Sequence, residues 1–127
     1  MTNSITINKC DNELILIAYQ WGASFQIARI LSGNNNNVDV QIDIQPGQFI
    51  EGVYIDGVNN GIENSRNFVN LQPGEYQLVA VGIDWGGPAE FNYTFNGEPQ
   101  NFPLTGEGDG VVWNPAPITF TVPEPTH

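Results

Sequence analysis

The chain has 127 residues, about the length of one domain, and its hydrophobic content of 40% is that of a globular protein. Three basic residues stand against 14 acidic ones, so the formal net charge is -11. This imbalance excludes nucleic acid and anionic membranes as partners, because both need a cationic protein surface.

Short runs of β-branched and aromatic residues alternate along the chain with clusters of Gly, Asn, Pro and Asp. This pattern is typical of sandwiches and barrels, and no segment has the periodicity of an amphipathic helix. We therefore expect an all-β fold, a single antiparallel β-sandwich of jelly-roll or Greek-key type in residues 1–122, with a frayed tail in residues 123–127. The expected strands are residues 3–8, 13–20, 25–31, 38–45, 48–55, 67–71, 75–83, 89–95, 110–113 and 117–122.

Two segments, residues 14–22 and 78–86, are almost copies of each other. Each is an aliphatic run that ends in a polar residue, a Trp and a Gly. A continuous apolar run indicates a strand buried on both faces, so the pair predicts two equivalent central strands. The repeat allows two equivalent binding sites, but a duplication retained only for packing explains it equally well.

The strand ends are the most promising places for a binding site. Trp21 and Trp85 each stand where a strand passes into a loop, and Trp113 precedes Asn114 and Pro115. A Trp ring offers a flat apolar face and an N–H donor, which suits sugar or protein recognition, although core packing is the alternative for each ring. The polar side chains expected to complete such a ligand-binding site are Gln20, Asp84, Asn92 and Asn114.

Catalytic chemistry has little support in the sequence. The one histidine is the last residue, His127, which excludes catalytic schemes that rely on a positioned histidine. Residues 38–44 alternate strictly, and their acids Asp39 and Asp43 are roughly 13 Å apart at about 3.3 Å per residue, too far for a glycosidase pair. We therefore predict a protein that is not an enzyme.

Metal and thiol chemistry are limited in the same way. The chain has one cysteine, Cys10, which excludes an internal disulfide and the usual zinc cluster, and we expect it to be half-exposed beside a turn. No cofactor is expected except calcium, which oxygen-rich loops can hold. The candidate calcium ligands are Asp56, Glu63, Glu107 and Asp109, with solvated loop acids as the alternative.

Residues 13–25, which run from Glu13 through Tyr19, Gln20 and Trp21 to Phe25, locally resemble the small A component of the Pir binary insecticidal toxins. That family has a strand that opens with Glu-Leu and closes in Tyr-Gln-Trp-Gly-Ala, followed by one residue and Phe. The resemblance implies a β-sandwich with a targeting role toward a cell-surface glycan or partner, and it transfers no binding residue.

The sequence thus predicts a lectin-like recognition domain for a neutral glycan. The alternative is a subunit of a binary or pore-forming toxin, or of another assembly, that binds a protein partner; a homo-oligomer is also open. A small glycosidase is a third alternative. The N-terminal segment has no secretory signal pattern, so we expect cytoplasmic synthesis, with release by a non-classical route if the protein acts outside the cell, unless the chain lacks its leader.

Overall fold

The computed structural model describes residues 2–33, 37–58, 61–86, 89–100, 104 and 110–124. Within these ranges every regular element is a strand, which confirms the all-β prediction, and no helix could cross a membrane. The strands are β1 (Asn3–Asp11), β2 (Glu13–Gln20), β3 (Ala23–Leu31), β4 (Asn37–Pro46), β5 (Val53–Asp56), β6 (Ser65–Leu71), β7 (Gly74–Asp84), β8 (Glu90–Phe95), β9 (Glu98–Gln100), β10 (Gly110–Trp113) and β11 (Ile118–Val122).

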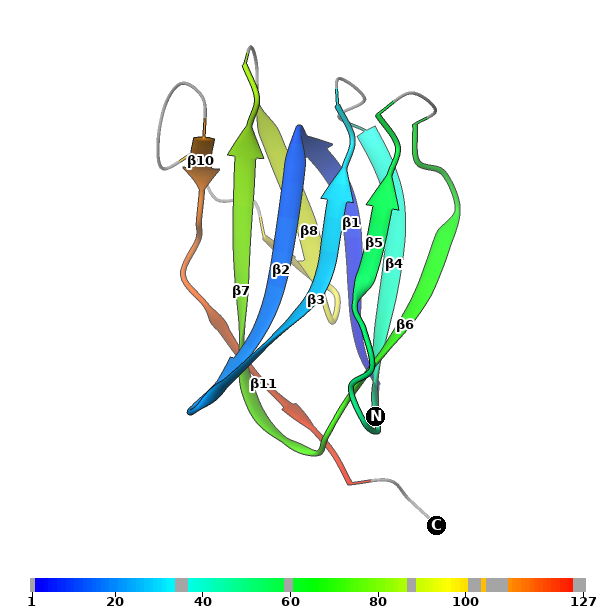
Figure 1. Ribbon diagram of the computed structural model, residues 1–127, viewed down its shortest axis with the longest axis vertical. Helices are drawn as coiled ribbons and strands as arrows, with labels where there is room; N and C mark the ends of the chain where they lie inside the picture. The colour runs from blue at the N-terminus through cyan, green and yellow to red at the C-terminus, as the bar shows by residue number, and fades with distance from the viewer. Residues whose placement is uncertain are drawn as a thin grey trace.

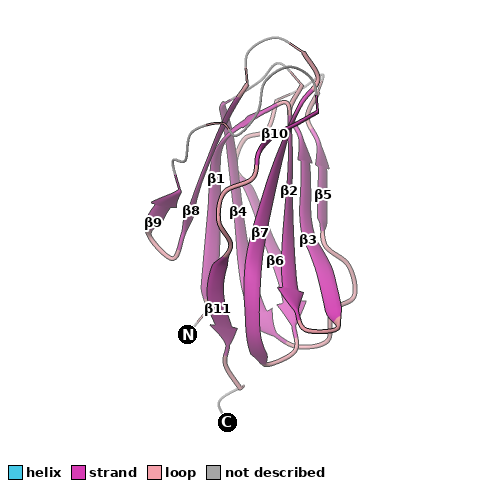
Figure 2. Ribbon diagram, turned by 90° about the vertical axis from the view of Figure 1, so that its left-hand side faces the viewer, coloured by secondary structure: helices cyan, strands magenta, loops and turns pink. Residues whose placement is uncertain are grey.

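These strands form two sheets that face each other across one hydrophobic core (Figure 1). The first sheet has the order β6-β4-β1-β8-β9. The second sheet has the order β10-β7-β2-β3-β5, and β11 also pairs with β7. Figure 2 shows the strands of both sheets from the side, with the loops gathered at the two ends of the molecule.

The sheets are mixed, so the expectation of a purely antiparallel structure is wrong. Most neighbours are antiparallel, but β5 runs parallel to β3, and β6 runs parallel to β4. The reason lies in the path of the chain: between β3 and β5 it crosses to the other sheet as β4, and it returns in the original direction. A crossover of this kind makes the two flanking strands parallel.

The two near-identical segments lie largely in β2 and β7, which are central strands of the second sheet, as the repeat predicted, and which pair with each other. Their burial differs from the prediction. Inward positions such as Leu16 and Ala80 are fully or almost fully buried in the core. Outward positions such as Ile15, Ile17 and Val81 are only half-buried, so the expectation of burial on both faces is wrong for the single chain.

The expected strand at residues 48–55 is shortened to β5 because its first half packs as a loop. Phe49 places its ring 5.2 Å from the ring of Phe25, edge to face, and the next residue, Ile50, is exposed. The short strand β9 was not expected; it pairs with β8 after a turn in which Gly97 has φ 85°. The other expected strands agree with the structure to within three residues at either end.

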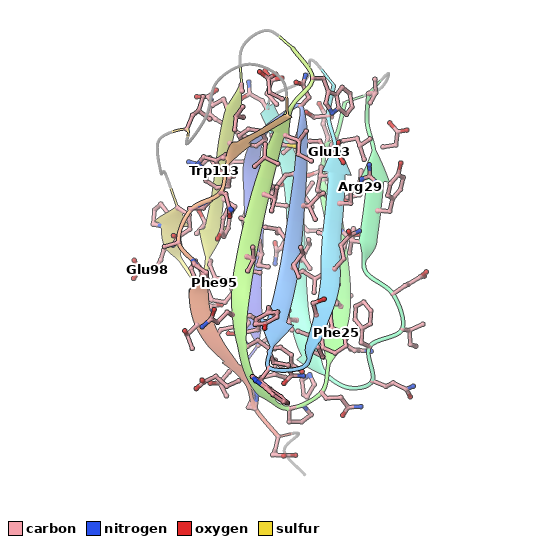
Figure 3. All side chains as sticks on the ribbon, turned by 60° about the vertical axis from the view of Figure 1, so that its left-hand side comes forward. Glu13, Phe25, Arg29, Phe95, Glu98 and Trp113 are labelled. Atoms are coloured by element: carbon pink, nitrogen blue, oxygen red, sulfur yellow. The ribbon has the colours of Figure 1, made fainter. Side chains whose placement is uncertain are left out.

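Trp113 belongs to the core, which corrects its assignment to a binding site. Its side chain is fully buried, stacked on Phe91 at 5.6 Å and edge-on to Tyr93 at 5.9 Å (Figure 3). Gly82 allows this packing, because a Cβ there would come within 2.8 Å of both Phe91 and Trp113. The strand β10 ends with its aromatic residue turned inward, so no face of the indole is open to a ligand.

Cys10 is likewise buried and not half-exposed. It lies near the end of β1, and its thiol donates to the Ile30 carbonyl across the core at 3.5 Å. Burial raises the pKa of this thiol to about 12. The thiol therefore remains protonated at neutral pH and acts as a small core side chain.

Replacing Trp113 with Ala is expected to lower the free energy of unfolding by about 3–5 kcal/mol, because it removes a large buried ring and its two aromatic contacts. Urea unfolding followed by circular dichroism measures the loss. The matched control is Trp21→Ala, at a ring that is 95% exposed, where a change of at most about 0.5 kcal/mol is expected. Equal losses in the two variants would contradict the assignment of Trp113 to the core.

Candidate functional site

An exposed tryptophan marks the turn between β2 and β3. Gln20 pairs with Ala23, so Trp21 and Gly22 alone form the turn. Gly22 has a φ of 83°, a backbone conformation that residues with a side chain rarely adopt. Trp21 is 95% exposed. Tyr19, two residues earlier on β2, is 47% exposed, so two aromatic side chains stand in solvent at one end of the molecule.

Beside this turn lies a cleft of about 440 Å³. One wall comes from the end of β2 and its turn, and the other from the beginning of β7, which β2 joins through the pair of Tyr19 with Gln77. The cleft thus combines aromatic rings, which offer apolar faces, with amide and carboxylate groups, which can form hydrogen bonds. Its lining residues are Tyr19, Gln20, Trp21, Glu75, Tyr76 and Gln77.

Hydrogen bonds hold the inner wall of the cleft in place. The hydroxyl of Tyr76 donates to the carbonyl of Gln72 at 2.7 Å, which closes the turn before β7. Burial raises the pKa of Tyr76 above its usual value, and the nearby side chain of Gln20 partly offsets this rise. The Tyr76 hydroxyl is thus held by the backbone of Gln72 at the inner wall of the cleft, next to the amide of Gln20.

Aromatic packing supports the cleft from below. The Tyr76 ring, which is 1% exposed, stacks on Phe120 at 5.6 Å and meets Phe25 edge-on at 6.2 Å. Phe25 in turn contacts Phe49 from the connection between β4 and β5. These contacts join the cleft to the core, so the positions of its wall residues are set by the fold.

Trp85 lies in a different environment. It is 43% exposed, its indole N–H donates to Glu13 at 3.1 Å, and its backbone N–H donates to the side chain of Asn12 at 2.7 Å. Glu13 is almost fully buried and accepts a second bond from Arg29 at 2.6 Å. The indole N–H of Trp85, which we expected to be available to a ligand, is therefore bonded to Glu13 within the fold.

The structure does not bring Trp21 and Trp85 into one binding site. The two rings follow antiparallel strands, so they lie at opposite ends of the second sheet. Their neighbours on β2, Tyr19 and Glu13, are about 20 Å apart along the strand. Figure 3 shows the separation: Glu13 lies near one end of the sheet and Phe25 near the other.

Other predicted site residues do not join the cleft. Asp84 is buried and accepts a bond from the backbone of Gly86 at 2.9 Å, Asn92 accepts one from Asn8 at 3.1 Å, and Asn114 is an exposed residue after β10. Of the predicted ligand-binding set, only Gln20 and Trp21 line the cleft. Tyr19, Glu75, Tyr76 and Gln77 were missed, although the Pro-Gly turn before Tyr76 signals a strand start at this position.

Of the four predicted calcium ligands, Asp56 and Glu63 lie in the described part of the chain. Asp56 accepts a bond from the backbone of Val58 at 3.1 Å, as in a turn, and Glu63 is exposed. Glu107 and Asp109 lie outside the described residues. Among the residues that are described, no three His, Cys, Asp or Glu side chains are close enough together to hold a metal ion.

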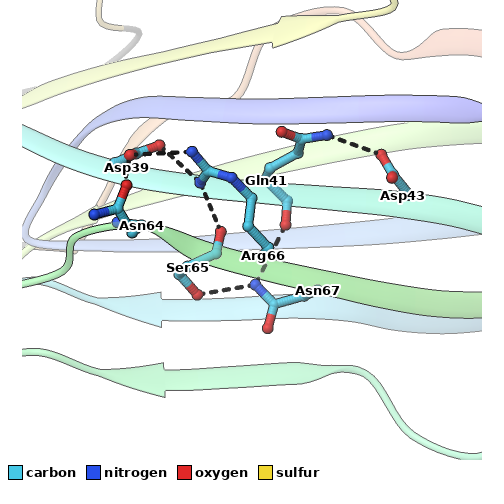
Figure 4. A network of polar contacts seen from close by, with 7 residues as sticks. All are labelled: Asp39, Gln41, Asp43, Asn64, Ser65, Arg66 and Asn67. Atoms are coloured by element: carbon cyan, nitrogen blue, oxygen red, sulfur yellow. Dashed lines mark hydrogen bonds and ion pairs between the residues drawn. The ribbon is translucent and has the colours of Figure 1, made fainter.

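The outer face of the first sheet carries polar side chains that bond to one another (Figure 4). Arg66 on β6 donates to both carboxylate oxygens of Asp39 on β4, at 3.0 and 3.3 Å, and holds the pKa of that carboxyl below its usual value. Asp43 accepts bonds from Ser4 at 2.9 Å and from Gln41 at 3.3 Å. The acids of this face thus connect neighbouring strands.

Comparison with known proteins adds no functional assignment. No protein-family model matches the chain, and neither curated proteins nor solved structures include a significant match. The function is therefore inferred from the residues and their geometry.

Asp11, at the end of β1, generates a test of the electrostatics near Trp85. Burial and the neighbouring carboxylates of Asp84 and Glu90 raise its pKa, so the folded protein binds this proton more tightly than the unfolded chain. The carboxylate therefore costs stability as the pH rises above the unfolded pKa of about 3.9. Asp11→Asn is expected to raise the urea midpoint at pH 7 and to match the wild type near pH 3. Equal midpoints at pH 7 would contradict this.

Proposed function

We propose that the protein is a non-catalytic recognition domain that binds a neutral glycan in the cleft beside Trp21. The observation that carries this proposal is the ring of Trp21, which is 95% exposed on a two-residue turn at the mouth of the cleft. A large apolar ring held in solvent by a tight turn is more useful to a ligand than to the fold, which gains little from it.

The chemistry of the cleft suits a sugar. The faces of the Trp21 and Tyr19 rings can pack against the apolar C–H face of a pyranose, and the amides of Gln20 and Gln77 can donate to and accept from its hydroxyls. The volume of about 440 Å³ lies within the range of small-molecule sites. A cleft of this composition favours one or two sugar rings over an extended peptide.

The charge distribution favours a neutral sugar over an acidic one. All three lysine and arginine side chains of the chain are in ion pairs: Lys9 with Glu90, Arg29 with Glu13, and Arg66 with Asp39. The cleft itself contains the carboxylate of Glu75. A sulfated or sialylated glycan would therefore approach a protein of net charge -11 whose cations are already paired.

We also propose that the two sheets form a β-sandwich of jelly-roll type. From β3 to β8 each successive strand lies in the sheet opposite to the strand before it, and this winding is that of a jelly roll. The parallel pairs at β5 and β6 depart from the purely antiparallel form of that fold.

A second proposal is that the chain is a subunit of a binary toxin or of another assembly with a protein partner. The segment that resembles the Pir A component, residues 13–25, covers β2, the Trp21 turn and the beginning of β3. It thus supplies one wall of the cleft and part of the outer face of the second sheet. On that face the segment presents the aliphatic side chains of Ile15 and Ile17, which are only half-buried, and this is the observation that favours a protein contact.

The glycan proposal is tested by a glycan array probed with the wild-type protein and with Trp21→Ala. Binding to a defined neutral glycan is expected, with a loss of at least about 10-fold in Trp21→Ala, because the stacking ring is removed. The matched control is Phe68→Ala, which removes a ring that is 65% exposed on the first sheet and should leave binding unchanged.

The array is run with calcium and again with a chelator, which tests a contribution from the acidic loops that contain Asp56 and Glu63. A blank array in both conditions with folded protein would contradict the glycan proposal and favour the protein partner. Unchanged binding by Trp21→Ala would place the glycan outside the cleft.

A further inference from the structure

The outer face of the second sheet is apolar across its central strands. Ile15 on β2 lies opposite Val81 on β7, and Ile17 lies opposite Val79. These side chains alternate with buried core residues, so they point away from the core, and they are half-buried by one another. We call this set the apolar face; its members are Ile15, Ile17, Val79, Val81, Ile83 and Val111.

The first sheet shows that this composition is not a property of every outer face in the molecule. At the matching positions of its central pairs, Ser4 lies opposite Asp43, and Thr6 lies opposite both Gln41 and Thr94. The central pairs of the first sheet thus present hydroxyls, an amide and a carboxylate, whereas those of the second sheet present aliphatic side chains. A cluster of aliphatic side chains that the chain itself leaves partly exposed is a candidate interaction site in a soluble protein.

We propose that a second copy of this chain covers the apolar face, so that two second sheets pack against each other around a two-fold axis. The area is at the lower end of what such a contact needs. The strands of the second sheet have 4, 11, 8, 9 and 4 residues, which at about 3.3 Å per residue and 4.8 Å per strand cover roughly 570 Å², close to the roughly 600 Å² that each partner contributes to the smallest specific interfaces.

The polar groups on this side do not oppose a contact between two copies. Arg29 and Glu13, which flank the aliphatic side chains, are bonded to each other at 2.6 Å, so neither needs an opposite charge from a partner. Half-exposed aromatic residues, which are enriched in protein interfaces, surround them on the same side. These are Tyr54 at 62% and Trp85 at 43% exposure.

The net charge predicts how this association responds to salt. Two copies with a charge of -11 each repel one another, and the repulsion acts over about 8 Å at physiological ionic strength but only about 3 Å at 1 M salt. The contact itself is apolar and is not weakened by screening. The dimer is therefore expected to become tighter as salt is added, whereas an interface built on ion pairs would become weaker.

Sedimentation equilibrium of the full chain tests the proposal, from about 1 µM to about 100 µM protein and from about 0.02 M to about 1 M NaCl. A mass of twice 13.9 kDa is expected at high concentration, with tighter association at high salt. A monomer under all conditions would overturn the proposal and leave the face to a partner of different sequence. Association that weakens with salt would overturn the apolar contact.

Two variants locate the contact. Val81→Lys, at the centre of the apolar face, is expected to weaken association at least about 100-fold, because the two-fold axis would bring two unpaired cations together. The matched control Thr6→Lys, on the central strand of the first sheet, should associate like the wild type. A folded Val81→Lys that still dimerises would overturn the assignment of the face.

If Val81→Lys does not fold, Val81→Thr retains the shape of the side chain and tests the same position, with a loss of association of at least about 5-fold expected. Wild-type association in folded Val81→Thr would overturn the assignment. The readout is mass, so it does not depend on any glycan, and failure of the glycan array would leave this result unchanged.

Discussion

Backbone hydrogen bonds between β2 and β7 join the two aliphatic runs of the chain side by side, with Leu16 opposite Ala80 at their middle. The inward halves of both runs supply the centre of the core, and the outward halves supply the apolar face. Because the pairing is antiparallel, it also sends the tryptophan of each run to a different end of the molecule. One pairing thus sets the core, the candidate dimer contact and the distance between the two rings.

The two tryptophans that follow β2 and β7 lie in different surroundings, although the sequences that precede them are almost the same. At one end the turn is two residues long, and Trp21 remains 95% exposed on it. At the other end the chain passes close to Asn12 and Glu13, which bond the backbone and the indole of Trp85. The repeat in the sequence is therefore a repeat of strands, and function differs with what each strand end meets.

Local sequence patterns predicted the strands well because alternation and Pro-Gly turns reflect the backbone directly. The alternation around Asp39 and Asp43 is an example, since its aliphatic residues are buried and its acids point outward. The exposure of a tryptophan depends instead on contacts distant in the sequence. Trp113 is buried because Gly82, about thirty residues earlier, leaves space for it, and no pattern near Trp113 records that. For the same reason the sequence predicted only part of the cleft: its second wall comes from β7, which is distant in the sequence from Trp21.

The three tryptophans occupy three different environments: Trp21 in solvent, Trp85 half-covered and bonded to a carboxylate, and Trp113 stacked in the core. Their fluorescence therefore separates by position. We expect emission from Trp21 to be red-shifted and accessible to a quencher, and emission from Trp113 to be blue-shifted and protected until the chain unfolds. The protein thus contains its own optical probes, one at the candidate cleft, one at the opposite end and one in the core, without any added label.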